Sequence, residues 1–219
     1  MLGTTGKDNY QALRWKKRLR LNERREVPCV SPSGCYVQGH MIIGVPKEIK
    51  IGETRVSMTP SLCRRVAALG GQVLIEKTAG DSAGFTDAEY KSAGATLVTT
   101  AAKVWKSADV ILKVKEPLAA EYHFLQQGQT LFTYLHLAAG PALAKELCRK
   151  NILGIAYETV EGSDGAFPLL KPMSQIAGRL SIQIGAYFLQ SQHGGSGVLL
   201  GGIPGTMPGH VVVVGAGHN

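Results

Sequence analysis

Three polar side chains of different chemistry follow apolar runs in this sequence. Arg55 lies in the loop VPKEIKIGETR after the run IIGV, Lys115 ends the run DVILKVK, and His136 ends the run TLFTYLH. An arginine can bind a carboxylate through two parallel hydrogen bonds, a lysine can polarise a carbonyl group, and a histidine can transfer a proton near neutral pH. Together they indicate a site for a small carboxylic acid that carries a second polar centre.

Each of these residues alone also has a plainer explanation. A lysine at the end of a strand is commonly a solvated charge, and a histidine beside apolar residues is commonly structural. Arg55 in a charged loop could simply lie on the surface. The prediction of a site therefore depends on convergence, because ligands bind at the carboxyl ends of the strands in an open parallel sheet.

Side-chain alternation adds a prediction about the two strand ends. If the strand over 130–136 stays extended to its last residue, His136 shares a face with Phe132 and Tyr134. Lys115 is then the last side chain of a strand over 109–115, whose other face carries Val110, Leu112 and Val114.

Strand and helix signals alternate from Met41 onward. Strands are predicted over 42–45, 72–77, 95–99, 109–115, 130–136, 152–160 and 210–215, and helices over 60–69, 100–108, 141–150 and 172–190. A capping box formed by Thr86 and Glu89 predicts a further short helix. This alternation predicts an α/β fold, with an open, mainly parallel sheet and flanking helices, followed by the start of a second βα unit.

The first predicted helix has clear boundary signals. Thr59 is the expected N-cap, followed by a proline at the first helical position, and two glycines follow the helix. Leu62, Val66 and Leu69 are expected to form its apolar stripe.

The run VVVVGAGHN at the end of the sequence resembles the beginning of a dinucleotide-binding turn. An apolar strand that leads into Gly215 and Gly217 places backbone N–H groups where a pyrophosphate binds. The third small residue, the following helix and the acidic residue for the ribose would all come after Asn219. The expectation is a cofactor site severed in mid-motif. The glycine-rich segment GGSGVLLGGIPG lacks the ending of a Walker A loop and is expected to be a flexible connection.

Composition limits the other classes of function. The net charge is +8, of which residues 1–40 carry +5, so a nucleic-acid footprint would belong to this basic leader. The leader lacks the apolar core of a signal peptide, and no uncharged apolar run approaches about 18 residues. We expect residues 1–40 to lie outside the fold. The four cysteines have no metal-ligand spacing, which favours reduced thiols in a cytoplasmic protein: Cys29, Cys35, Cys63 and Cys148.

Several long motifs, taken together, resemble one known family. IGVPKEIKIGETRVSMTP, LKVKEPLAAEY, LFTYLHLAA, IAYETV, PLLKPMSQIAGRLSIQIGAYFL, GVLLGGIPG and VVVVGAG are similar, in this order, to the N-terminal half of alanine dehydrogenases. The similarity extends from Met41 to Asn219. It implies NAD-dependent, reversible oxidative deamination of L-alanine to pyruvate and ammonia.

The resemblance also implies roles for individual residues. Arg55 and Lys115 would hold the carboxylate and the carbonyl of the substrate, and His136 would be the general acid and base. Ser174 would approach the cofactor, as would the glycines of the last motif. Residues 41–171 would form the substrate domain, and 172–219 would form a connecting helix, a linker and the first strand of a truncated Rossmann domain. Family members are generally hexamers, so a homo-oligomer is expected.

Two alternatives stay open at this point. The NAD-binding subunit of the proton-translocating transhydrogenase shares the opening motifs but lacks the histidine at the position of His136. The 219-residue chain could also be a non-catalytic module that binds a small acid, because the rest of the nucleotide domain and a catalytic aspartate would follow Asn219. On either reading we expect no membrane partner and no turnover by this chain alone.

Overall fold

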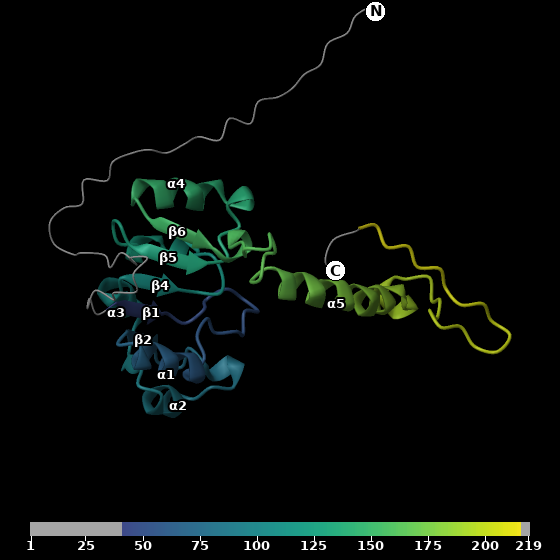
Figure 1. Ribbon diagram of the computed structural model, residues 1–219. Helices are drawn as coiled ribbons and strands as arrows, with labels where there is room; N and C mark the ends of the chain where they lie inside the picture. The colour runs from purple at the N-terminus through teal and green to yellow at the C-terminus, as the bar shows by residue number, and fades with distance from the viewer. Residues whose placement is uncertain (1–40, 216–219) are drawn as a thin grey trace, which may run out of the picture. The chain divides into compact units, whose positions relative to one another are not determined.

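The computed structural model describes residues 41–215 of the 219-residue chain (Figure 1). The predicted leader over 1–40 and the candidate cofactor residue Gly217 therefore lie outside the described residues.

The centre of the described fold is a sheet of six strands, all parallel. The strands are β1 (Ile42–Val45), β2 (Gln72–Glu76), β3 (Thr96–Val98), β4 (Val110–Leu112), β5 (Thr130–Thr133) and β6 (Leu153–Ala156). Their order across the sheet is β3-β2-β1-β4-β5-β6. Each neighbouring pair is parallel, so the predicted α/β class and parallel sheet are confirmed.

Helices connect successive strands. The α-helices are α1 (Pro60–Ala68), α2 (Asp87–Ser92), α3 (Ala101–Ser107), α4 (Pro141–Arg149) and α5 (Lys171–Leu189). Short 3₁₀ segments are η1 (Asp81–Ala83), η2 (Ala119–Phe124), η3 (Leu137–Ala139), η4 (Tyr157–Thr159) and η5 (Ser191–His193). The predicted caps are confirmed, because Thr59 accepts from the backbone N–H of Leu62 and Thr86 forms a capping box with Glu89.

Apolar side chains fill two separate clusters. One joins Cys63 of α1 and Tyr90 of α2 to residues of β1 and β2, including Val45, Val73 and Ile75. The other joins α3 and α4 to β4 and β5, through Val104, Trp105, Ile111, Leu131, Leu143 and Leu147. Right-handed crossovers that run outward in opposite directions from the sheet centre place α1 and α2 on one face and α3 and α4 on the other. Each cluster therefore fills the space between one face of the sheet and its helices.

The predicted apolar stripe of α1 needs a correction. Cys63 is the buried residue of this helix and Val66 packs against the same cluster, whereas Leu69 is 78% exposed. Leu69 is the C-cap, where the chain turns away into Gly70 with φ +81°. Its side chain therefore leaves the face that a continued helix would have buried.

The strand order reverses at the centre of the sheet. The chain runs outward from β1 to β3, returns through α3 to β4 beside β1, and then runs outward to β6. The loops that follow β1 and β4 therefore lead in opposite directions, which opens a crevice at the carboxyl edge. This crevice is the usual ligand site in sheets of this kind.

Among the described residues, several predicted strands are shorter than expected, and one is absent. The strand predicted over 152–160 ends at Ala156, because Tyr157–Thr159 form η4. β4 ends at Leu112 and β5 at Thr133, so neither Lys115 nor His136 lies on a strand. Residues 211–214 form no strand, and Val214 is 96% exposed. A strand needs a hydrogen-bonded neighbour, and none of the six described strands pairs with this run.

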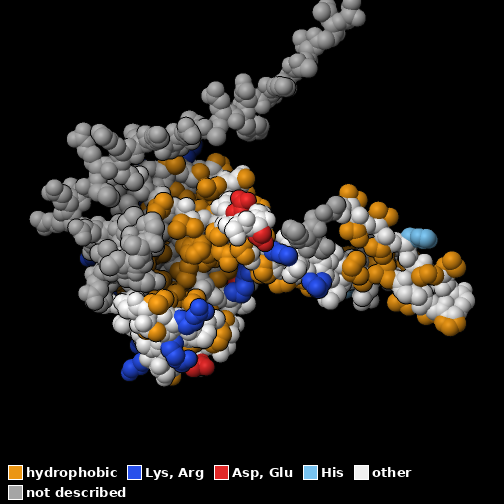
Figure 2. Space-filling view, in the orientation of Figure 1, with side chains coloured by type: hydrophobic (Ala, Val, Ile, Leu, Met, Phe, Trp, Pro, Cys, Tyr) orange, Lys and Arg blue, Asp and Glu red, His pale blue; other side chains and the backbone are white. Residues whose placement is uncertain are grey.

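Helix α5 has its predicted length but no buried residue. Apolar side chains are exposed along it and along the segment that follows, as the orange side chains in Figure 2 show. Among the described helices, none is both long and apolar enough to cross a membrane.

Candidate functional site

The loop after β1 presents Arg55 in a defined ionic contact. Its Nε donates to Glu53 Oε1 at 2.9 Å and its Nη2 donates to Glu53 Oε2 at 2.7 Å. The third nitrogen, Nη1, donates to the thioether sulfur of Met173 at 3.0 Å. This hydrogen bonding lowers the pKa of the Glu53 carboxyl, although burial opposes the shift. A thioether is a weak acceptor, so Nη1 is the donor that a substrate carboxylate can recruit at least cost.

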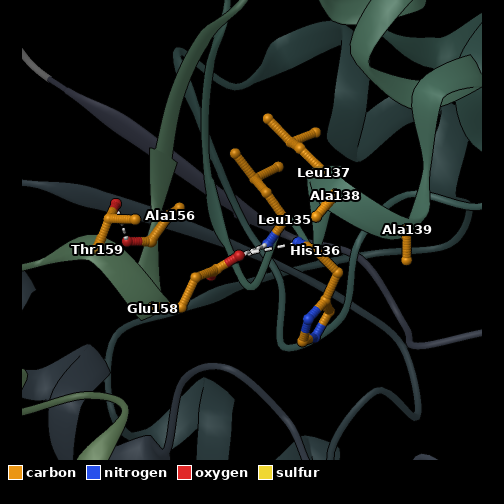
Figure 3. A pocket seen from close by; sticks show the side chains of 8 residues that line it. All are labelled: Leu135, His136, Leu137, Ala138, Ala139, Ala156, Glu158 and Thr159. Carbon is orange, nitrogen blue, oxygen red and sulfur yellow. Dashed lines mark hydrogen bonds between the residues drawn. The ribbon is translucent and has the colours of Figure 1, made fainter. Parts of the chain in front are cut away.

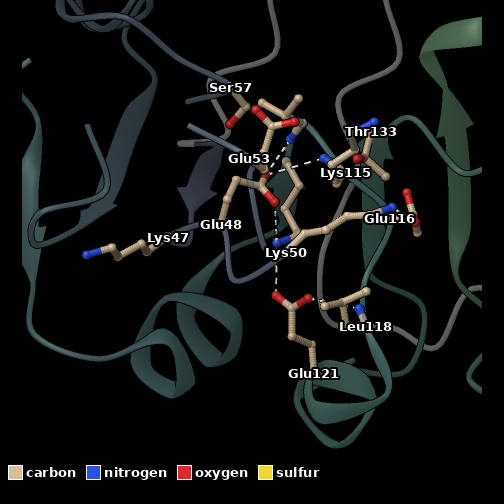
Figure 4. A network of polar contacts seen from close by, with 12 residues as sticks. Lys47, Glu48, Lys50, Glu53, Ser57, Lys115, Glu116, Leu118, Glu121 and Thr133 are labelled. Atoms are coloured by element: carbon tan, nitrogen blue, oxygen red, sulfur yellow. Dashed lines mark hydrogen bonds and ion pairs between the residues drawn. The ribbon is translucent and has the colours of Figure 1, made fainter. Parts of the chain in front are cut away.

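The segment after β4 is held by a buried ionic group (Figure 4). Lys113 is 1% exposed, and its ammonium contacts Glu48 Oε2 at 3.1 Å and Glu121 Oε1 at 2.9 Å. Glu48 Oε1 also accepts from the backbone N–H of Val114 at 2.6 Å and of Lys115 at 3.4 Å. A carboxylate from the β1 loop therefore replaces a neighbouring strand for these two N–H groups. This explains why pairing with β1 ends before Val114, while on the β5 side Lys113 N–H still donates to Phe132 O and Tyr134 N–H to Val114 O.

The segment after β5 turns at His136. Its φ of 46° and ψ of 38° lie in the left-handed region, so the extended geometry predicted for this residue is wrong. Glu158 of η4 explains the turn, because it accepts from the backbone N–H groups of Leu135 and His136. A non-glycine residue held in this conformation costs about 1–3 kcal/mol, and such costs cluster at functional sites.

A pocket of about 430 Å³ opens beside His136 (Figure 3). Its lining is mostly apolar, with Glu158 and Thr159 as its other polar members: Leu135, His136, Leu137, Ala138, Ala139, Ala156, Glu158 and Thr159. The imidazole points away from the side chain of Leu137 and is 46% exposed. A few polar groups in a mainly apolar hollow are typical of a site for a small molecule.

Arg55 and Lys115 lie outside the pocket lining and connect to His136 through shared neighbours. The ring of Tyr134 stacks on the imidazole with centroids 5.9 Å apart. Burial raises the pKa of the Tyr134 hydroxyl, and the charge of Arg55 partly offsets this effect. Lys115 in turn contributes to the lowered pKa of Glu53, the partner of Arg55. Among the described residues, the three predicted side chains are thus linked only through neighbours, and no direct contact joins any two of them.

Sequence reasoning placed Glu48 and Glu116 near the strand ends but gave no role to the carboxylates of this region. Glu48 and Glu53 lie in the same loop as Arg55, and Glu116 directly follows Lys115. A signal was present, since each acidic residue lies within two residues of a lysine or arginine. Only the tertiary arrangement shows which carboxylate pairs with which cation.

The candidate cofactor residues are less well defined. Ser174 is in the first turn of α5, next to Met173, and its side chain is half-buried. Gly215 belongs to an exposed segment without a strand, and a Cβ built there would meet no atom within 4 Å. The described residues therefore form no cradle for a dinucleotide, and the predicted cofactor role of these residues stays a prediction.

Comparison with known proteins places the chain in a family. Residues 44–177 match the family described as "Alanine dehydrogenase/PNT, N-terminal domain", and residues 181–218 match its C-terminal domain. The chain belongs to the alanine dehydrogenase/PNT family. The two matches cover β2 to β6, part of β1, the helices α1 to α4 and the loops that carry Arg55, Lys115 and His136.

Individual relatives agree with this placement. Alanine dehydrogenases of Methanococcus maripaludis and Mycobacterium tuberculosis are 55% and 53% identical over 177 residues, which is 81% of this chain and 48% of each relative. The chain therefore spans about half the length of these curated relatives. A solved L-alanine dehydrogenase superposes with a TM-score of 0.69 at 55% identity, covering 77% of this chain and 46% of that structure. A transhydrogenase from Sinorhizobium meliloti is more distant, with 26% identity and a TM-score of 0.58 over 67% of this chain and 44% of that structure.

Proposed function

We propose that this chain forms the part of an alanine dehydrogenase that binds pyruvate and L-alanine. The observation that supports this most is the delivery of Arg55, Lys115 and His136 to one edge of the sheet, around its reversal point. The identity of 55% to an alanine dehydrogenase, against 26% to a transhydrogenase, favours this activity over the alternative. In the whole protein, NAD would accept the hydride.

In this proposal, the residues of this chain bind and orient the acid. Nη1 of Arg55 exchanges the sulfur of Met173 for an oxygen of the substrate carboxylate, while Glu53 keeps the other two nitrogens in place. The ammonium of Lys115 supplies a point charge to the carbonyl oxygen of pyruvate. His136 carries the proton that this oxygen gains or loses.

The pocket beside His136 suits the remaining part of the substrate. The side chains of Leu135, Leu137 and Ala156 provide an apolar wall against which a methyl group can pack. Apart from His136, which the proposal assigns to the reacting oxygen, the lining contains no basic side chain for a second carboxylate, which favours a monocarboxylic acid.

Binding of pyruvate to the 219-residue chain tests the proposal. We expect amide and imidazole signals of the site to shift on titration, followed by two-dimensional NMR. Arg55→Met and Lys115→Met should each weaken binding about tenfold or more, since each removes a charge-assisted contact worth roughly 1.5–3 kcal/mol. Lys145→Met on α4 is the matched control, because it removes one exposed positive charge from a helix outside the site.

Equal pyruvate affinity in the parent and in Arg55→Met would contradict the proposed substrate site. We expect no NADH when the chain is incubated with L-alanine and NAD, because its described residues form no dinucleotide cradle. Production of NADH by the chain would overturn that expectation. The cytoplasmic location and the homo-oligomer stay predictions.

A further inference from the structure

Glu116 holds a carboxylate whose two oxygens have very different surroundings. Oε1 accepts from the ammonium of Lys50 at 2.5 Å. Oε2 is buried and has no hydrogen-bond partner among the described residues, and it lies 3.9 Å from Nε2 of His136. A buried carboxylate oxygen without a partner is costly, so its persistence beside an imidazole needs an explanation.

The other groups around the imidazole are already engaged. Glu158 uses its oxygens on the backbone N–H groups of Leu135 and His136. The hydroxyl of Tyr134, whose ring stacks on the imidazole, donates to the carbonyl oxygen of Leu169 at 2.6 Å. Among the charged groups that face the imidazole from β4, β5 and η4, Glu116 is the one with an oxygen still to satisfy.

Glu116 is also negatively charged under ordinary conditions. Burial raises the pKa of its carboxyl, but the hydrogen bond from Lys50, together with the charges of Lys50 and His136, brings it below its usual value. Electrostatic coupling between two groups is reciprocal, so a carboxylate that is stabilised by a protonated imidazole stabilises that imidazolium equally.

We propose that Glu116 is a positioning residue for His136, which holds the protonated imidazole through Nε2 while Lys50 fixes its other oxygen. This inference rests on the proposed function, in which His136 carries the proton of the reaction. A shift of about 1 Å would turn the 3.9 Å approach into a charge-assisted hydrogen bond. Lys50 holds Oε1 in place, but its positive charge also opposes protonation of the imidazole beside Oε2.

The proposal predicts that removing Glu116 and removing Lys50 shift the titration midpoint of His136 in opposite directions. Glu116→Gln should lower the titration midpoint of the His136 imidazole, because it removes the carboxylate that lies 3.9 Å from Nε2. Lys50→Met should raise the same midpoint by a similar or smaller amount, because it removes a competing positive charge. Glu146→Gln, which removes a carboxylate paired with Arg149 on α4, should leave the midpoint unchanged.

NMR titration of the histidine Cε1–H signals in the 219-residue chain measures these midpoints directly. Unchanged midpoints, or shifts of the same sign in Glu116→Gln and Lys50→Met, would overturn the proposal. If Glu116→Gln does not fold, Glu116→Asp takes its place: the shorter carboxylate keeps the charge but moves it away from Nε2, so the midpoint should fall, and an unchanged midpoint would overturn the proposal. Pyruvate binding is a separate measurement, so opposite shifts without pyruvate binding would refute the proposed function and keep the Glu116–His136 coupling.

Discussion

At the scale of single residues, positively charged side chains around the site are paired with glutamate carboxylates. Arg55, Lys113 and Lys50 each contact at least one carboxylate, and the carboxylates come from Glu53, Glu48, Glu121 and Glu116. Because each cation is already oriented by its partner, little conformational entropy is left to lose when an anionic substrate arrives. The same pairing reduces the repulsion between these lysine and arginine side chains.

The pairing of Glu53 with Arg55 predicts a specific pH dependence. The lowered pKa of Glu53 means that its ion pair stabilises the fold above pH 4.5, and that this stabilisation is lost as the pH falls through the lowered folded-state value. Glu53→Gln should therefore reduce the free energy of unfolding at pH 7 by about 1 kcal/mol, allowing for the exposure of Arg55. Urea unfolding at pH 7 and at pH 3 measures this, and the difference between parent and variant should shrink at pH 3. Exposed Glu161→Gln is the control, and an equal loss at both pH values would contradict the explanation.

At the scale of secondary-structure elements, the centre of the sheet depends on close packing between β1 and α3. A Cβ built on Gly44 would lie 2.6 Å from the Cβ of Ala108 and 2.8 Å from Cγ1 of Val104. The backbone of β1 therefore touches α3, the helix that brings the chain back across the sheet to β4.

Gly44→Ala should consequently destabilise the fold by overpacking. We expect a loss of about 1–3 kcal/mol in the free energy of unfolding, because the Cβ of Ala108 is fixed to its backbone and the side chains of Val104 and Ile111 are fully buried. Gly154→Ala on β6 is the matched control, since its added Cβ would meet only the end of the Leu135 side chain, at the longer distance of 3.0 Å. Chemical denaturation of both variants should give a larger loss for Gly44→Ala, and the reverse ranking would exclude the packing argument.

The buried lysine after β4 gives a second prediction at this scale. Lys113→Met should cost about 3–5 kcal/mol, because it leaves the carboxylates of Glu48 and Glu121 buried without their cation. Exposed Lys103→Met on α3 should change the free energy of unfolding by less than about 0.5 kcal/mol. Thermal and urea denaturation compare the two, and similar effects would show that the buried group adds nothing to the fold.

At the scale of the whole molecule, the described residues divide into a packed sheet and a helix with no buried side chain. The two apolar clusters involve α1 to α4 and the strands, whereas α5 adds no residue to either. Backbone amides of α5 should therefore exchange with solvent faster than those of β1 and β4, which are central in the sheet. Hydrogen exchange followed by mass spectrometry measures this difference. Equal protection at all protein concentrations would contradict it, while protection of α5 that grows with concentration would indicate self-association of this helix.

The sequence predicted the class of the fold well and the geometry of the site less well. Strand and helix positions followed from apolar periodicity and from caps such as Thr59 and Thr86, which are local signals. The early end of β4 could not be predicted, because it depends on Glu48, a residue more than 60 positions away in the chain. The turn at His136 likewise depends on Glu158, which lies 22 positions later in the chain. No local sequence pattern predicts a left-handed backbone conformation for this histidine.

The junction between β1 and β4 is small, since two residue pairs join the strands: Ile43 with Val110 and Gly44 with Ile111. More than 60 residues separate the two strands in the sequence, so the chain must close a long loop before β1 pairs with β4. This pairing is therefore expected to form slowly during folding. An acid bound by both Arg55 and Lys115 would link the loop after β1 to the segment after β4. Such a ligand should therefore slow the separation of β1 from β4, so that bound substrate also lowers the unfolding rate of the chain.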